Sequence, residues 1–360
     1  MTKQSPLSTE NRQERLIGIQ ACRGIAALLV ILYHSGRMLA LPQYAGHVPT
    51  GSVFAFGHAG VDFFFVLSGF IISLVHGHDL GVAERFPGYV WRRLSRIYPM
   101  YWVVTGLIIA LALFSADQAT RLAPNHVAAS VLLIPHGQEP LLGVAWTLEH
   151  EMLFYGLFGI AILRKQLIRP LLVSLFVLVA TEQLFHFGGI LGWLGNIYHL
   201  DFLIGIAAAL ILRDCRIGAP HLIALLGVTV FLCSGAAEDL ALLHPAGLTA
   251  TLLFGLASAT ILIGLAEAER RELLHFGLVA SLFGAASYSI YLIHPVAIGL
   301  TARFLVGTGA MPFLTDWILL VLVSAVAVAA GIGLHIAVER PVMIALGRIR
   351  PGRRGLVRVP

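Results

Sequence analysis

Long apolar runs recur along the whole chain, and they constrain its fold more than any other feature. Hydrophobic residues make up 58% of the 360 residues, charged residues only 12%, and the mean hydropathy is +0.85. A helix of roughly 20 apolar residues satisfies its own backbone hydrogen bonds in hydrocarbon, where an unpaired amide costs several kcal/mol. The sequence therefore predicts an all-α, polytopic integral membrane protein.

The apolar runs predict about ten transmembrane helices. The 37 glycines agree with this number, because small residues let membrane helices approach closely. The predicted spans are 16–40, 52–76, 97–115, 141–163, 169–187, 191–212, 219–236, 246–267, 278–305 and 314–338. An even number of spans places both termini on the same side of the membrane.

Basic residues concentrate in alternate loops, which gives the predicted helices a direction. Of the 24 Lys and Arg residues, 20 fall in one set of connections and tails, three in the other set, and Arg23 within the first span. Cytoplasmic loops are enriched in Lys and Arg, so both termini are predicted to be cytoplasmic. This topology and attraction to anionic lipid account for the net charge of +5 without nucleic-acid binding.

One membrane domain with two short tails accounts for the whole chain. Residues 1–15 are predicted to form a cytoplasmic tail, 16–341 the transmembrane domain and 342–360 a basic cytoplasmic tail. The first apolar run is too long for the core of a cleaved signal peptide, so we expect an uncleaved signal anchor. The three cysteines are odd in number and lie in apolar or membrane-edge sequence, so neither a disulfide nor a metal site is predicted.

Ionisable residues interrupt four predicted spans at similar depths. An ionisable residue within a membrane span is costly and indicates function. His34 lies three helical turns after Arg23, about 16 Å along the same helix face. The residues predicted to share the outer half of the bilayer are His34, Asp62, Glu149 or Glu151, and His294. Glu149 and Glu151 point about 200° apart, so both cannot face one cavity directly.

Histidine beside carboxylates is the usual equipment for general acid–base catalysis, because imidazole titrates near neutral pH and a carboxylate fixes its tautomer. A proton-coupled transporter or flippase of a lipid-linked glycan uses the same residues, and that alternative remains open on the residues alone. A structural or sensor protein is a third class, but it has no use for polar groups on four helices.

Three arginines precede the predicted third helix on the cytoplasmic side: Arg92, Arg93 and Arg96. Any one of them is explained by topology. Arg93 and Arg96, at a helical i,i+3 spacing, also suit a forked clamp for phosphate. Coenzyme A fits this site, since its pantetheine arm is long enough to carry a thioester into the bilayer.

Six motifs follow one another in the order of a known family. They are Arg23-x10-His34, GVDFFFVLSGFIIS, Arg93-x-x-Arg96 followed by Ile97-Tyr98-Pro99, WTLEHEMLFY, SYSIYLIHP and Glu339-Arg340-Pro341. Over nearly the whole chain the sequence resembles the membrane acyltransferase 3 family, which O-acylates polysaccharides, lipopolysaccharide and other glycosylated acceptors. The resemblance implies that His34 is the catalytic base or a transient acyl carrier, with Arg23 on the same path. It also implies donor binding by Arg93 and Arg96 and a donor-binding or structural role for Glu339.

Together these expectations define an O-acyltransferase of the bacterial inner membrane that uses cytosolic acyl-CoA, with acetyl-CoA the first choice and no metal. The expected catalytic residues are His34, Asp62, Glu149 and Glu151, with Asp62 or Glu149 orienting the imidazole of His34. The expected donor-binding residues are Arg23, Arg92, Arg93, Arg96 and Glu339. Trp146, Tyr288, Tyr291 and His294 are expected to line the site of a glycan or glycolipid acceptor. A homo-oligomer is compatible with the sequence, which leaves open the acyl group, acetyl or succinyl, and the acceptor.

Overall fold

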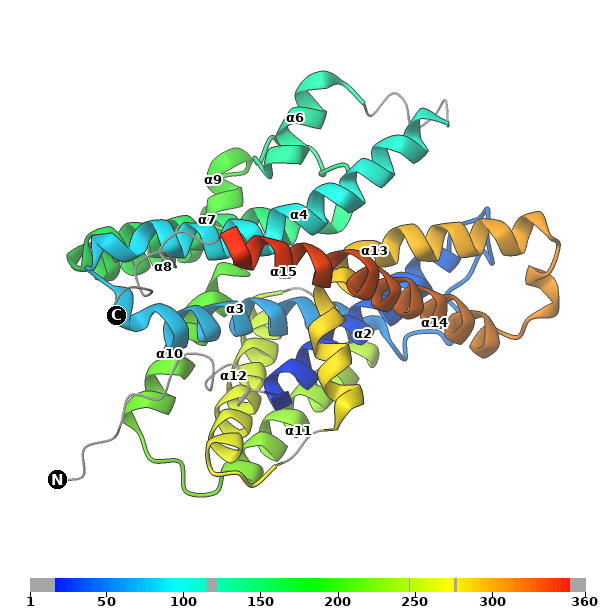
Figure 1. The fold of residues 1–360 in the computed structure, drawn as a ribbon. Helices are drawn as coiled ribbons and strands as arrows, with labels where there is room; N and C mark the ends of the chain where they lie inside the picture. The colour runs from blue at the N-terminus through cyan, green and yellow to red at the C-terminus, as the bar shows by residue number, and fades with distance from the viewer. Residues whose placement is uncertain (1–16, 115–121, 246, 275–276, 350–360) are drawn as a thin grey trace, which may run out of the picture.

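A computed structural model describes residues 17–114, 122–245, 247–274 and 277–349 of the chain (Figure 1). Within these ranges the regular secondary structure is helical throughout and includes no strand, which confirms the predicted all-α class. The predicted N-terminal tail and residues 350–360 of the predicted C-terminal tail lie outside the described residues.

Ten long helices make up most of the structure. In chain order they are α2 (Ile17–Leu39), α3 (Gly60–His76), α4 (Phe86–Leu113), α7 (Trp146–Leu163), α8 (Ile168–Phe185), α10 (His199–Asp214), α11 (Pro220–Asp239), α12 (Leu248–Arg270), α13 (Leu278–Gly307) and α14 (Asp316–Leu334). Shorter helices are α6 (Pro124–Leu132), α9 (Gly189–Leu194) and α15 (Arg340–Ile349). The single turns are η1 (Ala55–Ala59), η2 (Gly77–Asp79), η3 (Ala83–Arg85), η4 (Gly143–Ala145), η5 (Lys165–Leu167), η6 (Met311–Phe313) and the π-helical η7 (His335–Glu339).

Nine helical segments among the described residues are long and apolar enough to cross a membrane, so the chain is a multi-pass membrane protein. Nine of the ten predicted spans correspond to these segments. The tenth corresponds to α7, whose 18 residues include Glu149, His150 and Glu151 and are therefore less apolar. In Figure 1 the α3–α4 and α7–α8 connections lie together at the left, and the α13–α14 connection lies at the right. We call the first end, predicted to face the cytoplasm, the inner end.

The structure extends α4 well beyond its predicted start. The sequence placed Arg92, Arg93 and Arg96 in a loop, and this was wrong, because α4 begins at Phe86. Pro87 lies in the first turn of the helix, where a missing N–H removes no hydrogen bond and a fixed φ favours helix entry. The arginines therefore project from a rigid helix in defined directions, about 100° apart for neighbours.

The C-terminal region also differs from its predicted form. The last predicted span ends at 338 and a tail was expected from 342, but α14 ends at Leu334 and passes through η7 directly into α15. Residues 342–349 are therefore helical. Similarly, the predicted span 191–212 is two helices, because the chain turns at 195–198 between α9 and α10, where the Asn196 side chain accepts a hydrogen bond from the Tyr198 amide at 3.0 Å.

Three hydrophobic clusters fill the space between the helices. One joins α3, α4, α7, α10 and α13, a second joins α2, α3, α10, α11 and α12, and a third joins α2, α13 and α14. In Figure 1, α4, α7 and α8 lie on one side of α2 and α3, and α11 and α12 lie on the other. Helices α2, α3 and α13 therefore occupy the centre of the bundle, where their polar residues are shielded from lipid.

Pairs of glycines allow the central helices to touch through their backbones. A Cβ atom on Gly69 of α3 would lie 2.2 Å from the carbonyl oxygen of Phe202, and one on Gly205 of α10 would lie 2.0 Å from that of Val66. Each helix thus contributes a glycine where the other presents a carbonyl. A Cβ on Gly284 of α13 would likewise lie 2.3 Å from the Gln20 carbonyl of α2, so α2 and α13 are held equally close.

We predict that Gly205→Ala lowers the free energy of unfolding by about 1–3 kcal/mol, because the added methyl group must push α3 and α10 apart. Thermal unfolding of the purified protein, followed by tryptophan fluorescence, measures the change. Gly106→Ala in α4 is the matched control, since its Cβ would meet no atom within 4 Å. An equal loss in both variants would contradict the assigned helix contact.

Candidate active site

Seven polar residues from five elements gather inside the bundle. They are Arg23, Arg93, Arg96, Glu151, Tyr155, Tyr288 and Glu339, and we call them the inner polar cluster. Arg23 of α2 lies within electrostatic range of Arg96, Glu151 and Glu339, and Tyr288 of α13 lies within range of the same three side chains. The fold thus brings together four of the residues that were expected to bind the donor: Arg93 and Arg96 from α4, Arg23 from α2 and Glu339 from η7.

Glu151 is the acidic centre of this cluster. Its Oε1 accepts a hydrogen bond from Ser68 Oγ of α3 at 3.0 Å and another from the hydroxyl of Tyr155. Tyr155 follows Glu151 by four residues, so the two side chains share one face of α7. Of the two glutamates that sequence could not separate, Glu151 therefore faces the arginines.

Arg93 is held over aromatic rings. The centre of its guanidinium lies 5.0 Å from the ring centroid of Tyr155 and 5.8 Å from that of Tyr89, both within the range of cation–π attraction. Tyr89 is itself fixed, because its hydroxyl donates to the Tyr155 carbonyl at 2.8 Å. The rings hold the arginine without neutralising its charge, which leaves that charge available to an anion.

Glu339 enters the cluster from the π-helical turn. Its Oε2 accepts hydrogen bonds from Ser289 Oγ of α13 at 2.7 Å and from Nδ1 of His335 at 2.8 Å. A π-helical turn rotates the following residues relative to a regular helix, and such turns are frequent at functional sites. The turn therefore joins the end of α14 to α13 through the carboxylate of Glu339. The sequence predicted only that Glu339 lies at the end of the last helix.

Arg92 belongs to a different group. It lies 3.8 Å from Oδ2 of Asp79, which is 2% exposed and also accepts a hydrogen bond from Nδ1 of His76 at 2.7 Å. Arg93 lies between this group and the inner polar cluster, because it is within electrostatic range of His76 as well as over the ring of Tyr155. Of the predicted donor-binding residues in the described part of the chain, Arg92 is the one that pairs with Asp79.

His34 and His294 form a pair on α2 and α13, with ring centroids 5.0 Å apart. Nδ1 of His34 lies 2.9 Å from the Val30 carbonyl, and Nδ1 of His294 lies 2.6 Å from the Tyr291 carbonyl. A carbonyl only accepts, so each Nδ1 carries a proton, and in the neutral imidazole each Nε2 keeps a lone pair. The Nε2 atom of His294 is buried and has no hydrogen-bond partner among the described residues.

Proline 295 explains why the Tyr291 carbonyl is available. In a regular helix this carbonyl would accept from the amide four residues later, but Pro295 has no N–H. Figure 1 shows the first half of α13 (yellow) and its second half (orange) running in different directions, as expected at a proline. The freed carbonyl fixes the tautomer of His294. Tyr291 itself bonds Thr147 of α7 at 2.9 Å, which links the pair to α7.

Asp62 does not accompany His34. It lies in a second buried group with Asp201 of α10, His58 of η1 and Glu238 of α11, in which Nε2 of His58 is 2.9 Å from Oε2 of Glu238. Glu149 is 5% exposed, and its Oε1 has no partner in the described part of the chain. The imidazole of His34 is therefore oriented by a backbone carbonyl, and neither predicted carboxylate makes that contact.

Trp146 is surrounded by other aromatic rings. Its ring centroid lies 5.3 Å from Tyr198, 5.8 Å from His150 and 6.1 Å from Phe65. Nδ1 of His150 is 2.9 Å from Nε2 of His199, whose own Nδ1 donates to the Leu194 carbonyl at 2.8 Å. The predicted acceptor residues are thus divided, with Trp146 here, Tyr291 and His294 beside His34, and Tyr288 in the inner polar cluster.

Several buried or half-buried polar residues were not among the predicted site residues. They are His58, Ser68, Tyr155, His150, His199, Asp201, Glu238 and His335. The cost of an ionisable residue in a membrane span could have identified the charged members, because all lie in or beside predicted spans. Ser68 and Tyr155 carried no such signal, since a hydroxyl in an apolar helix is common. Among the described residues, no group of three or more His, Cys, Asp or Glu is arranged to hold a metal ion.

We predict that Asp79→Asn lowers the free energy of unfolding by about 1–3 kcal/mol, because the charge that pairs His76 and Arg92 is lost from a buried position. Thermal unfolding in detergent measures this. Asp214→Asn is the control, since Asp214 is exposed and, among the described residues, forms its ion pair with the adjacent Arg213; a surface change of this kind stays within about 0.5 kcal/mol. Equal stability of the two variants would argue against a structural Asp79 group.

Comparison with known proteins identifies relatives over most of the chain. A family model described as an acyltransferase domain matches residues 16–336. The exopolysaccharide production protein ExoZ of Rhizobium meliloti (strain 1021) is 30% identical over 318 residues, which cover 85% of this chain and 96% of that protein. Acyltransferase MdmB of Streptomyces mycarofaciens is 27% identical over 389 residues, covering 94% and 95%.

A shorter relative matches half of the chain. Protein 2 in the picA locus of Rhizobium radiobacter is 28% identical over 207 residues, which cover 49% of this chain and all of that protein. No solved structure matches the chain. The similarity is therefore one of sequence, and the geometry described above is this chain's own.

Proposed function

The chain belongs to the acyltransferase family whose domain model covers residues 16–336, and from this premise we propose that it transfers an acyl group from acyl-CoA to a hydroxyl of a glycan. Membership confirms the resemblance drawn from the six sequence motifs. It favours group transfer over the glycan transporter that the buried histidines and carboxylates also allowed. Acetyl-CoA is the simplest donor, and the bacterial inner membrane is the proposed location.

One observation carries the proposal: the same two helices contribute to both polar sites. Helix α2 places Arg23 in the inner polar cluster and His34 in the histidine pair, 11 residues or about 16 Å apart. Helix α13 places Tyr288 in the cluster and His294 in the pair. A donor held at the cluster would therefore lie beside two packed helices that both carry an imidazole farther along.

The inner polar cluster supports anion binding. Arg93 and Arg96 lie on α4 at i,i+3, and guanidinium groups bind phosphate through paired hydrogen bonds. Arg93 has no carboxylate partner among the ion pairs of the described residues, and its aromatic neighbours leave its charge exposed to a ligand. We assign the phosphates of CoA to these arginines, with Arg23 beside the pantetheine arm and Glu151 and Glu339 orienting the arginines.

The histidine pair supports a two-step transfer. In the first step, Nε2 of His34 attacks the thioester carbonyl and the C–S bond breaks, which leaves an acyl-imidazolium and the thiolate of CoA; the thiolate leaves and takes up a proton from water. In the second step, the acceptor hydroxyl attacks the acyl group as Nε2 of His294 takes its proton, and the C–N bond to His34 breaks. His34 is then neutral again, and His294 returns its proton to water. Direct attack of the hydroxyl on the thioester, with His34 as base, is the one-step alternative.

A glycan is the proposed acceptor because of the names of this chain's relatives. One relative is named for exopolysaccharide production and another as an acyltransferase. Tyr291 lies beside the histidine pair, and an aromatic face suits the apolar side of a sugar ring. The acceptor class proposed first is therefore an exopolysaccharide or its lipid-linked precursor.

We predict that His34→Ala reduces transfer by at least about 100-fold, because the step that the imidazole performs contributes 10²–10⁴ to the rate. The measurement is release of free CoA by purified protein with acetyl-CoA and a glycan acceptor. His47→Ala is the control, because His47 is exposed and contacts Asp316 at the surface. A stably inserted His34→Ala protein that transfers the acyl group at the normal rate would contradict the proposal.

His294→Gln separates the two steps. We expect acyl-enzyme to accumulate in this variant, because Gln cannot accept the proton of the attacking hydroxyl. Brief incubation with radiolabelled acetyl-CoA and quantification of protein-bound label tests this. Unchanged turnover, or turnover lost with no bound label, would contradict the role of His294 as the second base.

We predict that Arg93→Gln and Arg96→Gln each raise KM for acetyl-CoA by about 10–100-fold, since a hydrogen bond to a charged group contributes about 1.5–3 kcal/mol. Turnover at saturating donor should change much less. Arg164→Gln, at an exposed position in the α7–α8 connection, controls for loss of positive charge at the inner end. An equal rise in KM for Arg164→Gln would replace the specific clamp by general electrostatic attraction.

A further inference from the structure

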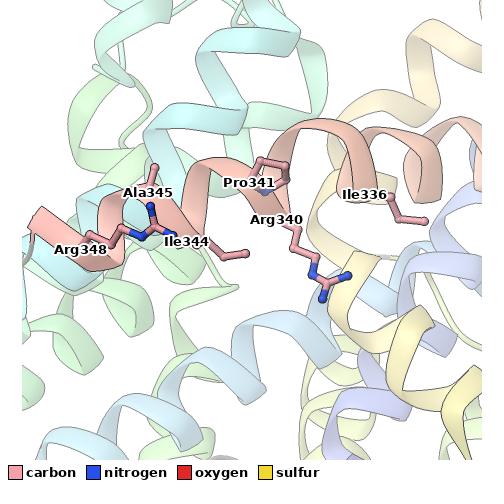
Figure 2. A pocket seen from close by; sticks show the side chains of 6 residues that line it. All are labelled: Ile336, Arg340, Pro341, Ile344, Ala345 and Arg348. Atoms are coloured by element: carbon pink, nitrogen blue, oxygen red, sulfur yellow. The ribbon is translucent and has the colours of Figure 1, made fainter.

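A hollow lies along the exposed face of the last helix. It has a volume of about 450 Å³ and is lined by Ile336, Arg340, Pro341, Ile344, Ala345 and Arg348. Figure 2 shows Arg340 and Arg348 along α15 with Ile344 between them. The hollow thus combines two cations with an apolar floor, on a segment that continues directly from a membrane-crossing helix.

The opposite face of this segment is already packed. Leu334 and Val338 contact the cluster that joins α4, α7 and α13, and α15 rests against α4. Ile336 and Ile344, by contrast, are each 52% exposed. Half-exposed isoleucines on a membrane-associated helix indicate contact with lipid chains, because lipid is the apolar medium available to that face.

The two arginines lack the partners that other arginines at the inner end have. Arg270 and Arg271 pair with Glu267, and Arg213 pairs with Asp214. For Arg340 and Arg348, the described part of the chain supplies no ion pair with a carboxylate. A cation beside hydrocarbon needs an anionic partner, and the phosphate of a lipid headgroup is the one always present.

We infer that this hollow binds an anionic phospholipid, with a lipid phosphate on each arginine and acyl chains along Ile336 and Ile344. The arginines are eight residues apart, about 12 Å along the helix axis, and long side chains can close part of that distance. A lipid with two phosphates, such as a diphosphatidylglycerol, therefore engages both arginines at once. Guanidinium groups suit phosphate because they donate paired hydrogen bonds.

A soluble phosphate ligand such as CoA fits the hollow less well. The lining residues of the hollow come from η7 and α15 alone, so most of the polar surface of a nucleotide would be left against lipid and without a protein partner. The neighbouring Glu339 belongs to the inner polar cluster, but it points to Ser289 and His335, away from this face. The lipid site is therefore separate from the proposed donor site.

The site has a structural consequence for the inner polar cluster. Arg340 follows Glu339 directly, and η7 and α15 are continuous. A lipid held by Arg340 and Arg348, with its chains along Ile336, would span α15 and η7 and so stabilise the helical turn that positions Glu339. Lipid binding at this face should therefore raise the stability of the protein without contributing a reacting group.

Native mass spectrometry of the full chain tests the site with diphosphatidylglycerol, phosphatidylglycerol and phosphatidylcholine as probes. Each arginine near an anionic lipid contributes about fivefold in affinity, so Arg340→Gln with Arg348→Gln should weaken diphosphatidylglycerol binding by about 25-fold. Arg164→Gln is the matched control and should bind as the unchanged protein does. Diphosphatidylglycerol should also raise the thermal unfolding midpoint of the unchanged protein, but not that of the double variant.

Three results would overturn the inference. The first is that the double variant binds diphosphatidylglycerol as tightly as the unchanged protein. The second is that Arg164→Gln loses as much binding as the double variant, which indicates general charge attraction. The third is that CoA displaces the lipid, which assigns the hollow to a soluble nucleotide. Lipid binding is measured without any reaction, so its outcome is independent of the proposed acyl transfer. The lipid site can be confirmed when acyl transfer is not found, and acyl transfer can be confirmed when the lipid site is not.

Discussion

An ionisable side chain in hydrocarbon must have a partner, and most of this structure is arranged around that requirement. Carboxylates, arginines and histidines from five or more elements meet in separate groups within the bundle. They can do so because glycines such as Gly69 and Gly205 let the helices approach to backbone contact. Close packing removes the lipid, and the removal of lipid makes buried charge tolerable. The polar groups and the glycine contacts are therefore one design feature.

Two helices connect the two polar sites on which the proposed function depends. Helices α2 and α13 each have one residue in the inner polar cluster and one in the histidine pair, and a carbonyl that Pro295 leaves free fixes the proton of His294. The backbone thus sets the tautomer: in both imidazoles Nδ1 faces a carbonyl oxygen, and the neutral ring keeps its lone pair on Nε2. A nucleophile and a base of the same tautomer can then face a substrate from two sides.

Hydropathy and charge asymmetry predicted the all-α class and nearly every span, because the hydrophobic effect and helical hydrogen bonding act on local sequence. The depth predicted for His34 and His294 agrees with the contact between their rings, but Glu151, predicted at the same depth, lies with Arg23 in the inner polar cluster. The rotation of each helix about its axis could not be predicted, because it depends on which helix faces pack together. This rotation decides which neighbours a side chain faces. Asp62, assigned to His34 by depth, instead faces α10 and α11. Arg92, adjacent in sequence to Arg93, lies with Asp79 for the same reason.

The central claim is that the bilayer separates donor from acceptor and that the acyl group crosses between them through this chain. Proteoliposomes with uniformly oriented protein test it most directly, with acetyl-CoA supplied only on the side of the inner end and a glycan acceptor only on the other. The account predicts acylated glycan, with none when the two compartments are exchanged. Transfer only when donor and acceptor share one compartment would contradict it.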